Sequence, residues 1–200
     1  GCPAGKIVKH DSGAGLIQNP ELAKEIIRET KRGASTNTGQ SLPISVKTRI
    51  GYNKIITQEW ISHLIEAEPA AIIIHGRTMK EMSQVPAHWD IIGEVATMAH
   101  EYGTLVVGNG DVLSQGEGKE KAAQFGVDGI MVGRGIFHNP WLFNKDINPS
   151  TISSVDRLAL LLQHTCLYKE LWGETKSLGH MKKFYKVYVS GWDGAKDLRM

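Results

Sequence analysis

The sequence has few cysteines, no long apolar run and almost no net charge. Two cysteines among 200 residues cannot form a disulfide framework, which excludes the small disulfide-stabilised proteins. Apolar runs such as residues 70–74 are far shorter than the roughly 20 residues that a membrane helix needs. A net charge of +2 does not by itself indicate a nucleic-acid partner. Since no signal peptide is recognisable either, we expect a cytoplasmic protein with no membrane contact.

The pattern of apolar residues is typical of an α/β protein. Four short strands are predicted, over residues 44–50, 70–74, 104–107 and 129–132. They alternate with helices predicted over residues 57–68, 89–101 and 119–125. Alternation with short loops favours a parallel sheet. The run at 70–74 is continuous, which predicts a strand buried on both faces.

The period changes after Pro140. A polar connector precedes two predicted helices, over residues 155–172 and 176–192. In the second helix, one set of residues recurs at helical spacing and is expected to be buried: Met181, Phe184, Tyr185 and Tyr188. We therefore predict two domains, a catalytic α/β domain over 1–146 and a helical domain over 147–200.

Glycine and polar residues follow two neighbouring strands. Asn109, Gly110 and Asp111 come after one strand, and Gly133 and Arg134 after the next. Glycine lets backbone N–H groups approach an anion closely, and an arginine fork suits a phosphate. Such sites recur after the last strands of (β/α)8 barrels. The alternative is that these glycines only form tight turns, but the two groups in this order favour a phosphate site.

Three further residues are candidates for cofactor contacts or catalysis. A lysine at a barrel mouth, such as Lys47, suits an electron-rich cofactor ring, the alternative being a salt bridge. His75 ends the next strand, with a structural histidine as the alternative. Cys2 lies in a Gly-Cys-Pro motif. A cysteine thiol is mostly protonated near neutral pH, so Cys2 could act as a general acid. The alternative is that Cys2 is a small buried hydrophobic residue. From the residues alone, burial is the better interpretation for Cys2, and also for Cys166, which lies in an apolar stripe.

Lysines cover one side of the last predicted helix. Lys182, Lys183 and Lys186 have no acidic residue between them. Each contact of a lysine with a phosphate adds salt-sensitive affinity for a polyanion. From the residues alone, a solvated surface is a better interpretation than an RNA-binding one.

Taken together, these motifs resemble one family, the flavin-dependent tRNA-dihydrouridine synthases, and most closely its bacterial B-type branch. The matching strings cover the chain in order: Gly1-Cys2-Pro3-Ala4, Gly13-Ala14-Gly15-Leu16, Val46-Lys47-Thr48-Arg49-Ile50-Gly51, Ile74-His75-Gly76-Arg77-Thr78, Asn109-Gly110-Asp111, Val132-Gly133-Arg134-Gly135 and Asn139-Pro140-Trp141. The tail from His180 to Arg199 is similar to the terminal helix of that branch. Each string is weak alone, whereas their order and spacing are specific.

The resemblance implies a fold, a reaction and cofactors. The fold is an FMN-binding (β/α)8 TIM barrel followed by a small all-helical tRNA-binding domain. The reaction is the reduction of a uridine in tRNA, at the D-loop, to 5,6-dihydrouridine. FMN, reduced by NADPH or NADH, passes a hydride to C6, and a cysteine matching Cys2 protonates C5.

Residue roles follow from the same resemblance. Lys47 and His75 match flavin contacts, and the phosphate and ribitol contacts fall on these residues: Asn109, Gly110, Asp111, Gly133 and Arg134. The side chains expected to contact tRNA are Arg49, Arg77, Lys182, Lys183 and Lys186. No metal and no protein partner are implied.

The chain begins in the middle of a motif. Only about four βα units of the barrel are present, so we interpret the chain as an N-terminally truncated, C-terminal part of such an enzyme. Two alternatives stay open: a truncated, non-catalytic tRNA-binding product, and an FMN-barrel oxidoreductase that acts on a small molecule.

Overall fold

The computed structural model describes residues 1–34 and 41–199. They divide into two compact units, residues 1–133 and 134–200, which we describe separately. The domain boundary predicted after residue 146 lies beyond this division and stays a prediction.

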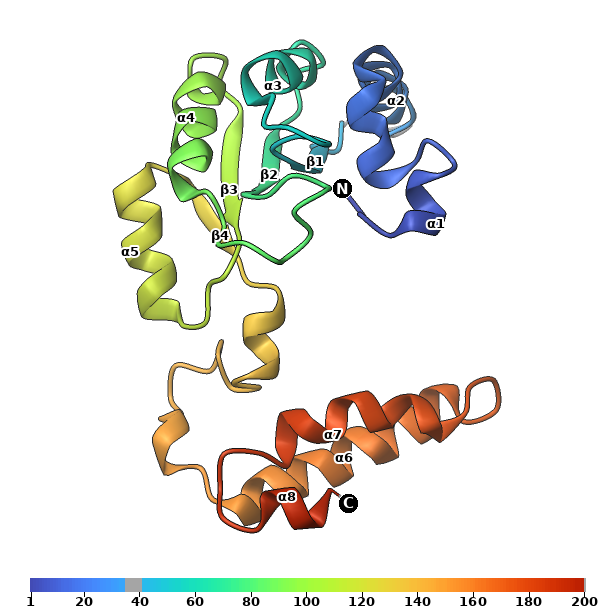
Figure 1. Cartoon of the computed structure of the whole chain (residues 1–200), viewed down its shortest axis with the longest axis vertical. Coiled ribbons are helices and arrows are strands. Elements are labelled where there is room, and N and C mark those ends of the chain that lie inside the picture. Colours follow the sequence, from blue (N-terminus) through green and yellow to red (C-terminus); the bar gives the residue numbers. More distant parts are fainter. Residues whose placement is uncertain (35–40, 200) are drawn as a thin grey trace. The chain divides into compact units, whose positions relative to one another are not determined.

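The first unit contains a four-stranded parallel sheet, as predicted. Its strands follow one another in the order β1 (Ser45–Arg49), β2 (Ala71–His75), β3 (Leu105–Asn109) and β4 (Gly129–Met131) (Figure 1). Each strand lies within two residues of its predicted ends. Because all strands are parallel, their carboxyl ends meet at one edge of the sheet.

Helices connect the strands and pack on one another in chain order. The three predicted helices are present as α3 (Thr57–Ile65), α4 (Trp89–His100) and α5 (Gln115–Phe125). Three elements before the sheet were not predicted: α1 (Gly5–Val8), the 3₁₀ helix η1 (Gly13–Gln18) and α2 (Pro20–Gly33). α2 begins where the Asn19 side chain accepts a hydrogen bond from the Leu22 N–H, with proline in its first turn.

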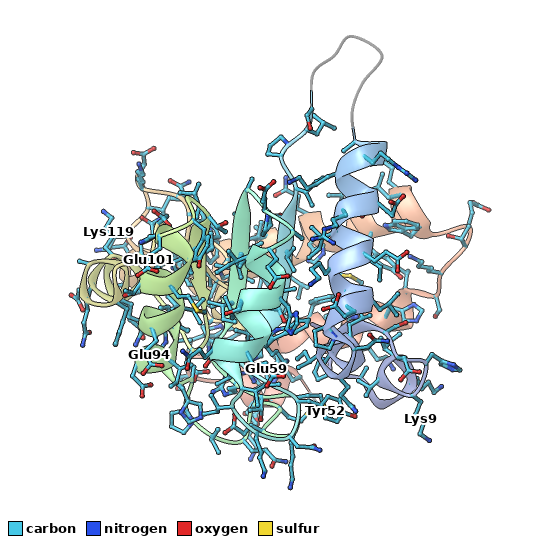
Figure 2. The ribbon with its side chains drawn as sticks, turned by 90° about the horizontal axis from the view of Figure 1, so that it is seen from above. Lys9, Tyr52, Glu59, Glu94, Glu101 and Lys119 are labelled. Carbon is cyan, nitrogen blue, oxygen red and sulfur yellow. The ribbon has the colours of Figure 1, made fainter. Side chains whose placement is uncertain are left out.

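The helices bury one face of the sheet. Ile72 and Ile74 of β2 are fully buried, whereas Ile73 between them is only half-buried. Since alternate side chains of a strand point to opposite faces, the helices cover the face of Ile72 and Ile74. The prediction that this strand is buried on both faces is wrong for the described residues. On the far side of the helices, exposed residues such as Glu59, Glu94 and Lys119 lie on the outer surface (Figure 2).

In the second unit, the described residues form helices and no strand. These are η2 (Arg134–Phe137), η3 (Pro149–Thr151), α6 (Ser154–Trp172), η4 (Leu178–Met181), α7 (Lys182–Tyr188) and α8 (Ala195–Leu198). α6 begins with a capping box between Ser153 and Asp156. The helix predicted over 176–192 is shorter at both ends: α7 begins only at Lys182, after η4, and it ends at Tyr188 because Val189 leaves the helical conformation.

Two burial predictions for this unit are wrong. Met181 and Tyr188 are buried as expected and Phe184 is half-buried, but Tyr185 is 38% exposed. Cys166 is also exposed. The reason is the same for both: α6 and α7 pack along one narrow seam, and α6 contains no buried residue. Apolar spacing alone does not show how wide such a seam is.

Candidate functional site

The register of the sheet brings three predicted site residues onto one face. His75 pairs with Arg49 on one side and with Asn109 on the other, and Lys47 lies two residues before Arg49. Paired residues of a parallel sheet share a face, as do residues two apart in one strand. This is the face opposite the helices. Lys47, His75 and Asn109 therefore stand together on the less covered face, near the carboxyl edge.

Lys47 and Asn109 are joined directly. Lys47 Nζ donates a hydrogen bond to Asn109 Oδ1 at 2.9 Å, and Asn109 Nδ2 donates to the Met131 carbonyl at 2.7 Å. The lysine is thus held by an amide oxygen, which is not the salt bridge weighed as an alternative. Partial burial, and secondarily the charge of Arg49, lower the pKa of Lys47. The site accordingly presents a cation whose charge is poorly compensated.

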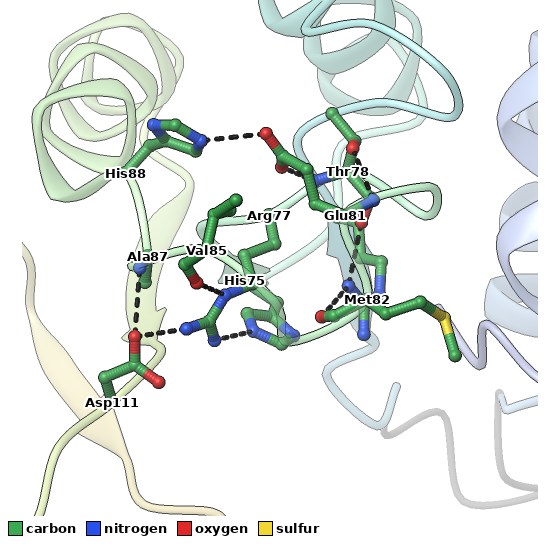
Figure 3. Close-up of polar contacts among 10 residues, drawn as sticks. His75, Arg77, Thr78, Glu81, Met82, Val85, Ala87, His88 and Asp111 are labelled. Carbon is green, nitrogen blue, oxygen red and sulfur yellow. Dashed lines mark hydrogen bonds and ion pairs between the residues drawn. The ribbon is translucent and has the colours of Figure 1, made fainter.

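His75 is a neutral hydrogen-bond acceptor. Burial lowers its pKa to about 4, with further lowering by Arg49, Lys47 and Arg77. Arg77 Nη1 lies 3.3 Å from His75 Nε2 and, being a donor only, donates to it (Figure 3). Nε2 must then carry the lone pair and Nδ1 the proton. His75 therefore combines a defined tautomer with a place on the open face.

Arg77 is buried and fixes the loop that follows β2. Its Nε donates to the Val85 carbonyl at 2.6 Å, and its Nη2 pairs with the Asp111 carboxylate (Figure 3). Asp111 also accepts from the Ala87 N–H at 2.9 Å. This ion pair joins the ends of β2 and β3. Such burial favours a structural role for Arg77 over the predicted contact with tRNA.

Arg49 is similarly buried, and it links three segments. Its Nη1 donates to the carbonyls of Thr78 at 2.9 Å and Met82 at 3.2 Å. Its Nε donates to the carbonyl of Gly1 at 3.3 Å. Arg49 thereby ties the segment of Cys2 to β1 and to the loop after β2, which again favours a structural role over the predicted contact with tRNA.

Cys2 is exposed, so the alternative of a buried hydrophobe does not hold. Gly13 packs against it in the left-handed region, with φ of 59°. A Cβ at Gly13 would lie 2.7 Å from the Cys2 carbonyl oxygen, so only glycine allows this approach. The Ala14 N–H also donates to that oxygen, at 2.9 Å. The glycine-rich stretch therefore shapes the backbone that presents the thiol.

The predicted phosphate residues fall into two groups. Gly110 adopts φ of 143°, and a Cβ there would lie 2.5 Å from the Ala87 Cβ, so the chain turns tightly against the loop after β2. Gly133 follows β4, and a Cβ added there would have no neighbour within 4 Å. Arg134 begins η2 in the second unit and is exposed. Asn109, Gly110 and Asp111 are thus brought together with His75, whereas Arg134 lies in the other unit.

The predicted lysines are all exposed on α7. Lys183 Nζ lies 4.9 Å from the centre of the Phe184 ring. A cavity of about 580 Å³ opens beside Lys183 and Lys186 and is also lined by Phe137. The cavity was not predicted, because its residues are distant in sequence.

A polar cluster in the loop after β2 was also missed. Glu81 accepts from the Thr78 N–H at 2.7 Å, and the Glu81 N–H donates back to Thr78 Oγ1 at 3.2 Å. His88 Nε2 lies 3.0 Å from Glu81 Oε1. The Thr-x-x-Glu spacing is a capping-box signal that could have revealed this turn. Within the described ranges, no three His, Cys, Asp or Glu side chains group as metal ligands, and no helix is long and apolar enough to span a bilayer.

Comparison with known proteins gives one consistent result. The family model described as dihydrouridine synthase matches residues 1–200. A probable tRNA-dihydrouridine synthase of Staphylococcus epidermidis is 42% identical over all of this chain and 60% of its own length. Similar relatives are a probable tRNA-dihydrouridine synthase of Staphylococcus aureus, at 41% identity, and probable tRNA-dihydrouridine synthase 2 of Bacillus subtilis, at 40%. The chain thus spans about 60% of the length of these curated relatives.

Proposed function

Because the chain belongs to the dihydrouridine synthase family, we propose that the protein containing it reduces a uridine of tRNA to 5,6-dihydrouridine. The family resemblance supplies the substrate and the reaction. The observation that carries the proposal on this chain is the shared face of Lys47, His75 and Asn109, with the exposed Cys2 tied by Arg49 to the same sheet.

The open sheet face suits FMN. An under-compensated cation at Lys47 matches the electron-rich flavin ring, and the neutral His75 adds a hydrogen-bonding group beside it. Asn109, Gly110 and Gly133 would hold the phosphate and ribitol, and the family resemblance alone adds Arg134 to these residues. When bound and reduced by NADPH or NADH, FMN supplies the hydride that goes to C6 of the uracil.

The carboxylate of Asp111 has a different part. It is paired with Arg77, and the negative charge of a carboxylate would repel a phosphate. We therefore assign its side chain to fixing Arg77 beside His75, and leave phosphate binding in this unit to the backbone of the glycine residues.

Cys2 is the proton donor of the proposed reaction. The double bond between C5 and C6 is saturated when C6 gains a hydride and C5 gains the thiol proton, so the product is 5,6-dihydrouridine. The proton must come from a group that reaches an unstacked base, because a stacked and paired uridine hides both carbons. Cys2 is exposed and its backbone is held in place by Gly13.

The exposed lysines of α7 are the proposed tRNA contacts. Lys182, Lys183 and Lys186 form a basic surface on a short helix. Folded RNA is bound largely through phosphates and shape, so such a surface suits tRNA and would serve no purpose for a small substrate. This favours the synthase over an oxidoreductase of small molecules.

The two cysteines offer a matched test. Both are exposed, and only Cys2 is assigned to the reaction. The complete protein, supplied with FMN, NADPH and unmodified tRNA, should form dihydrouridine, measured by mass spectrometry of digested tRNA. Cys2→Ala should slow this by about 100-fold or more with flavin still bound, whereas Cys166→Ala should keep the rate. A colourless protein that leaves tRNA unchanged would refute the proposed function; an active Cys2→Ala variant would refute the acid alone.

A further inference from the structure

The second unit contains a cavity whose aromatic wall has no role in the proposed function. It has a volume of about 580 Å³ and lies between η2 and α7. Phe137 and His138 border it from one side, and Lys183, Phe184 and Lys186 from the other. The volume is within the range of sites that bind small organic groups, about 300–1,000 Å³.

Aromatic rings form its apolar wall. The rings of Phe137 and Phe184 are 6.0 Å apart, and Phe137 is 47% exposed. Phe184 is supported from behind by His164, whose ring is 5.5 Å away and whose Nδ1 lies 2.8 Å from the Tyr188 hydroxyl. Phe184 is thus held in place, and Phe137 remains partly exposed at the cavity.

The charge around the cavity has one sign. Lys183 and Lys186 are exposed at its border, and none of the described residues that line it is acidic. An aromatic wall edged by cations is complementary to a group that is flat and apolar on one part and anionic on another. An unstacked nucleotide of RNA has this chemistry, because its base offers a π face and its phosphates are negative.

We propose that this cavity binds one unstacked base of the tRNA by stacking on Phe137, while the adjoining phosphates contact Lys183 and Lys186. The inference rests on the proposed tRNA substrate and adds a base-stacking subsite to the basic surface of α7. It commits to RNA, because an apolar peptide would gain nothing from the two lysines.

Phenylalanine offers a matched pair for the test. Phe143 is 66% exposed in the same unit and does not line the cavity. The affinity of the complete protein for an unmodified tRNA transcript is measured at several salt concentrations. Phe137→Ala should weaken binding by roughly 5- to 150-fold with an unchanged salt slope, since stacking releases no counterions. Phe143→Ala should bind as the unsubstituted protein, and Phe137→Tyr should restore binding because it restores the ring.

The lysines should behave in the opposite way. Replacing Lys183 and Lys186 with glutamine should weaken binding and reduce the salt slope by about 0.7–0.9 for each phosphate that the protein no longer neutralises. If the slope and affinity stay unchanged in this variant and in Lys182→Gln, the basic surface of the proposed function is refuted. If the lysine variants weaken binding but Phe137→Ala matches Phe143→Ala, only the cavity proposal is refuted.

A cross-linking experiment locates the base independently. A transcript containing 4-thiouridine is irradiated with the protein, and the attached peptides are identified by mass spectrometry. Cross-links should fall on residues 137–138 or 183–187 and disappear in Phe137→Ala. Cross-links elsewhere only would refute the proposal. So would a Phe137→Ala variant that alters the melting temperature or the oligomeric state but not RNA affinity, because the cavity would then be covered by protein.

Discussion

Arg77 and Asp111 form an ion pair across the ends of β2 and β3. The pair is asymmetric: the Arg77 side chain is 4% exposed and that of Asp111 is 38% exposed. Arg77 also binds the Val85 carbonyl, and Asp111 accepts from the Ala87 N–H, so one pair holds both sides of the loop. The conformation of the loop therefore depends on the buried guanidinium of Arg77 and on its pairing with Asp111.

Removing the carboxylate should cost stability. Asp111→Ala leaves the buried Arg77 guanidinium without its counter-charge, so we expect a loss of about 2–3 kcal/mol in the free energy of unfolding. Asp111→Asn keeps an acceptor and should lose less. Denaturant unfolding measures both, with the exposed Asp146 changed to alanine as the control, which should stay within about 0.5 kcal/mol. Equal stability of Asp111→Ala and the control would show that the pair does not hold the loop.

His75 should make stability depend on pH. Its pKa in the folded state is about 4, against 6.5 in the unfolded chain, so between these values the unfolded state binds more protons. The contribution of neutral His75 to stability is therefore complete above pH 6.5 and is lost progressively as the pH falls toward 4. His75→Gln should remove this part of the slope. An NMR titration of the ring protons measures the pKa directly, and a midpoint near 6.5 would show that burial does not lower the pKa of His75.

Much of the fold could be predicted because its signals are local. Each strand is a short apolar run ended by glycine or polar residues, and the four predicted strands are present in a parallel sheet. The shared face of Lys47, His75 and Asn109 also follows from alternation once the strands are aligned. The position of these three residues therefore follows from two regularities: side chains alternate between the two faces of a strand, and the carboxyl ends of parallel strands lie at one edge.

The remainder depends on contacts that no local pattern encodes. Arg49 and Arg77 stand beside predicted flavin contacts, yet the structure buries both and uses them on backbone carbonyls of the loop after β2. The sequence shows an arginine at a strand end, but not which loop folds over it. The predicted burial of Tyr185 and Cys166 was wrong for a similar reason. Helical spacing identifies one face of a helix, but it does not show whether another element covers that face.

Gly110 should not tolerate a side chain. Its φ of 143° is unfavourable for other residues, and an added Cβ would lie 2.5 Å from the Ala87 Cβ. Gly103 has φ of 73° but nothing within 4 Å of such a Cβ, so Gly103→Ala introduces only backbone strain, about 1–2 kcal/mol. We expect Gly110→Ala to be less stable than Gly103→Ala and to lose flavin affinity as well. Calorimetry and flavin titration of the two variants measure this. If both lose the same stability and keep flavin, the turn does not require glycine for close packing.

Lys47 should contribute to FMN affinity without contributing to the stability of the fold. Partial burial and the nearby Arg49 lower its pKa, which shows that the folded protein disfavours its charge. Lys47→Met should therefore leave the free energy of unfolding equal or slightly higher, while FMN affinity falls about tenfold, since the ring loses its cation. The control is Lys119→Met on the outer surface of α5, which should change neither quantity (Figure 2). Fluorescence quenching of FMN and thermal melting give the two readouts. If Lys47→Met kept its flavin affinity and unfolded more easily, its hydrogen bond to Asn109 would be the reason for the lysine, and the proposed ring contact would be wrong.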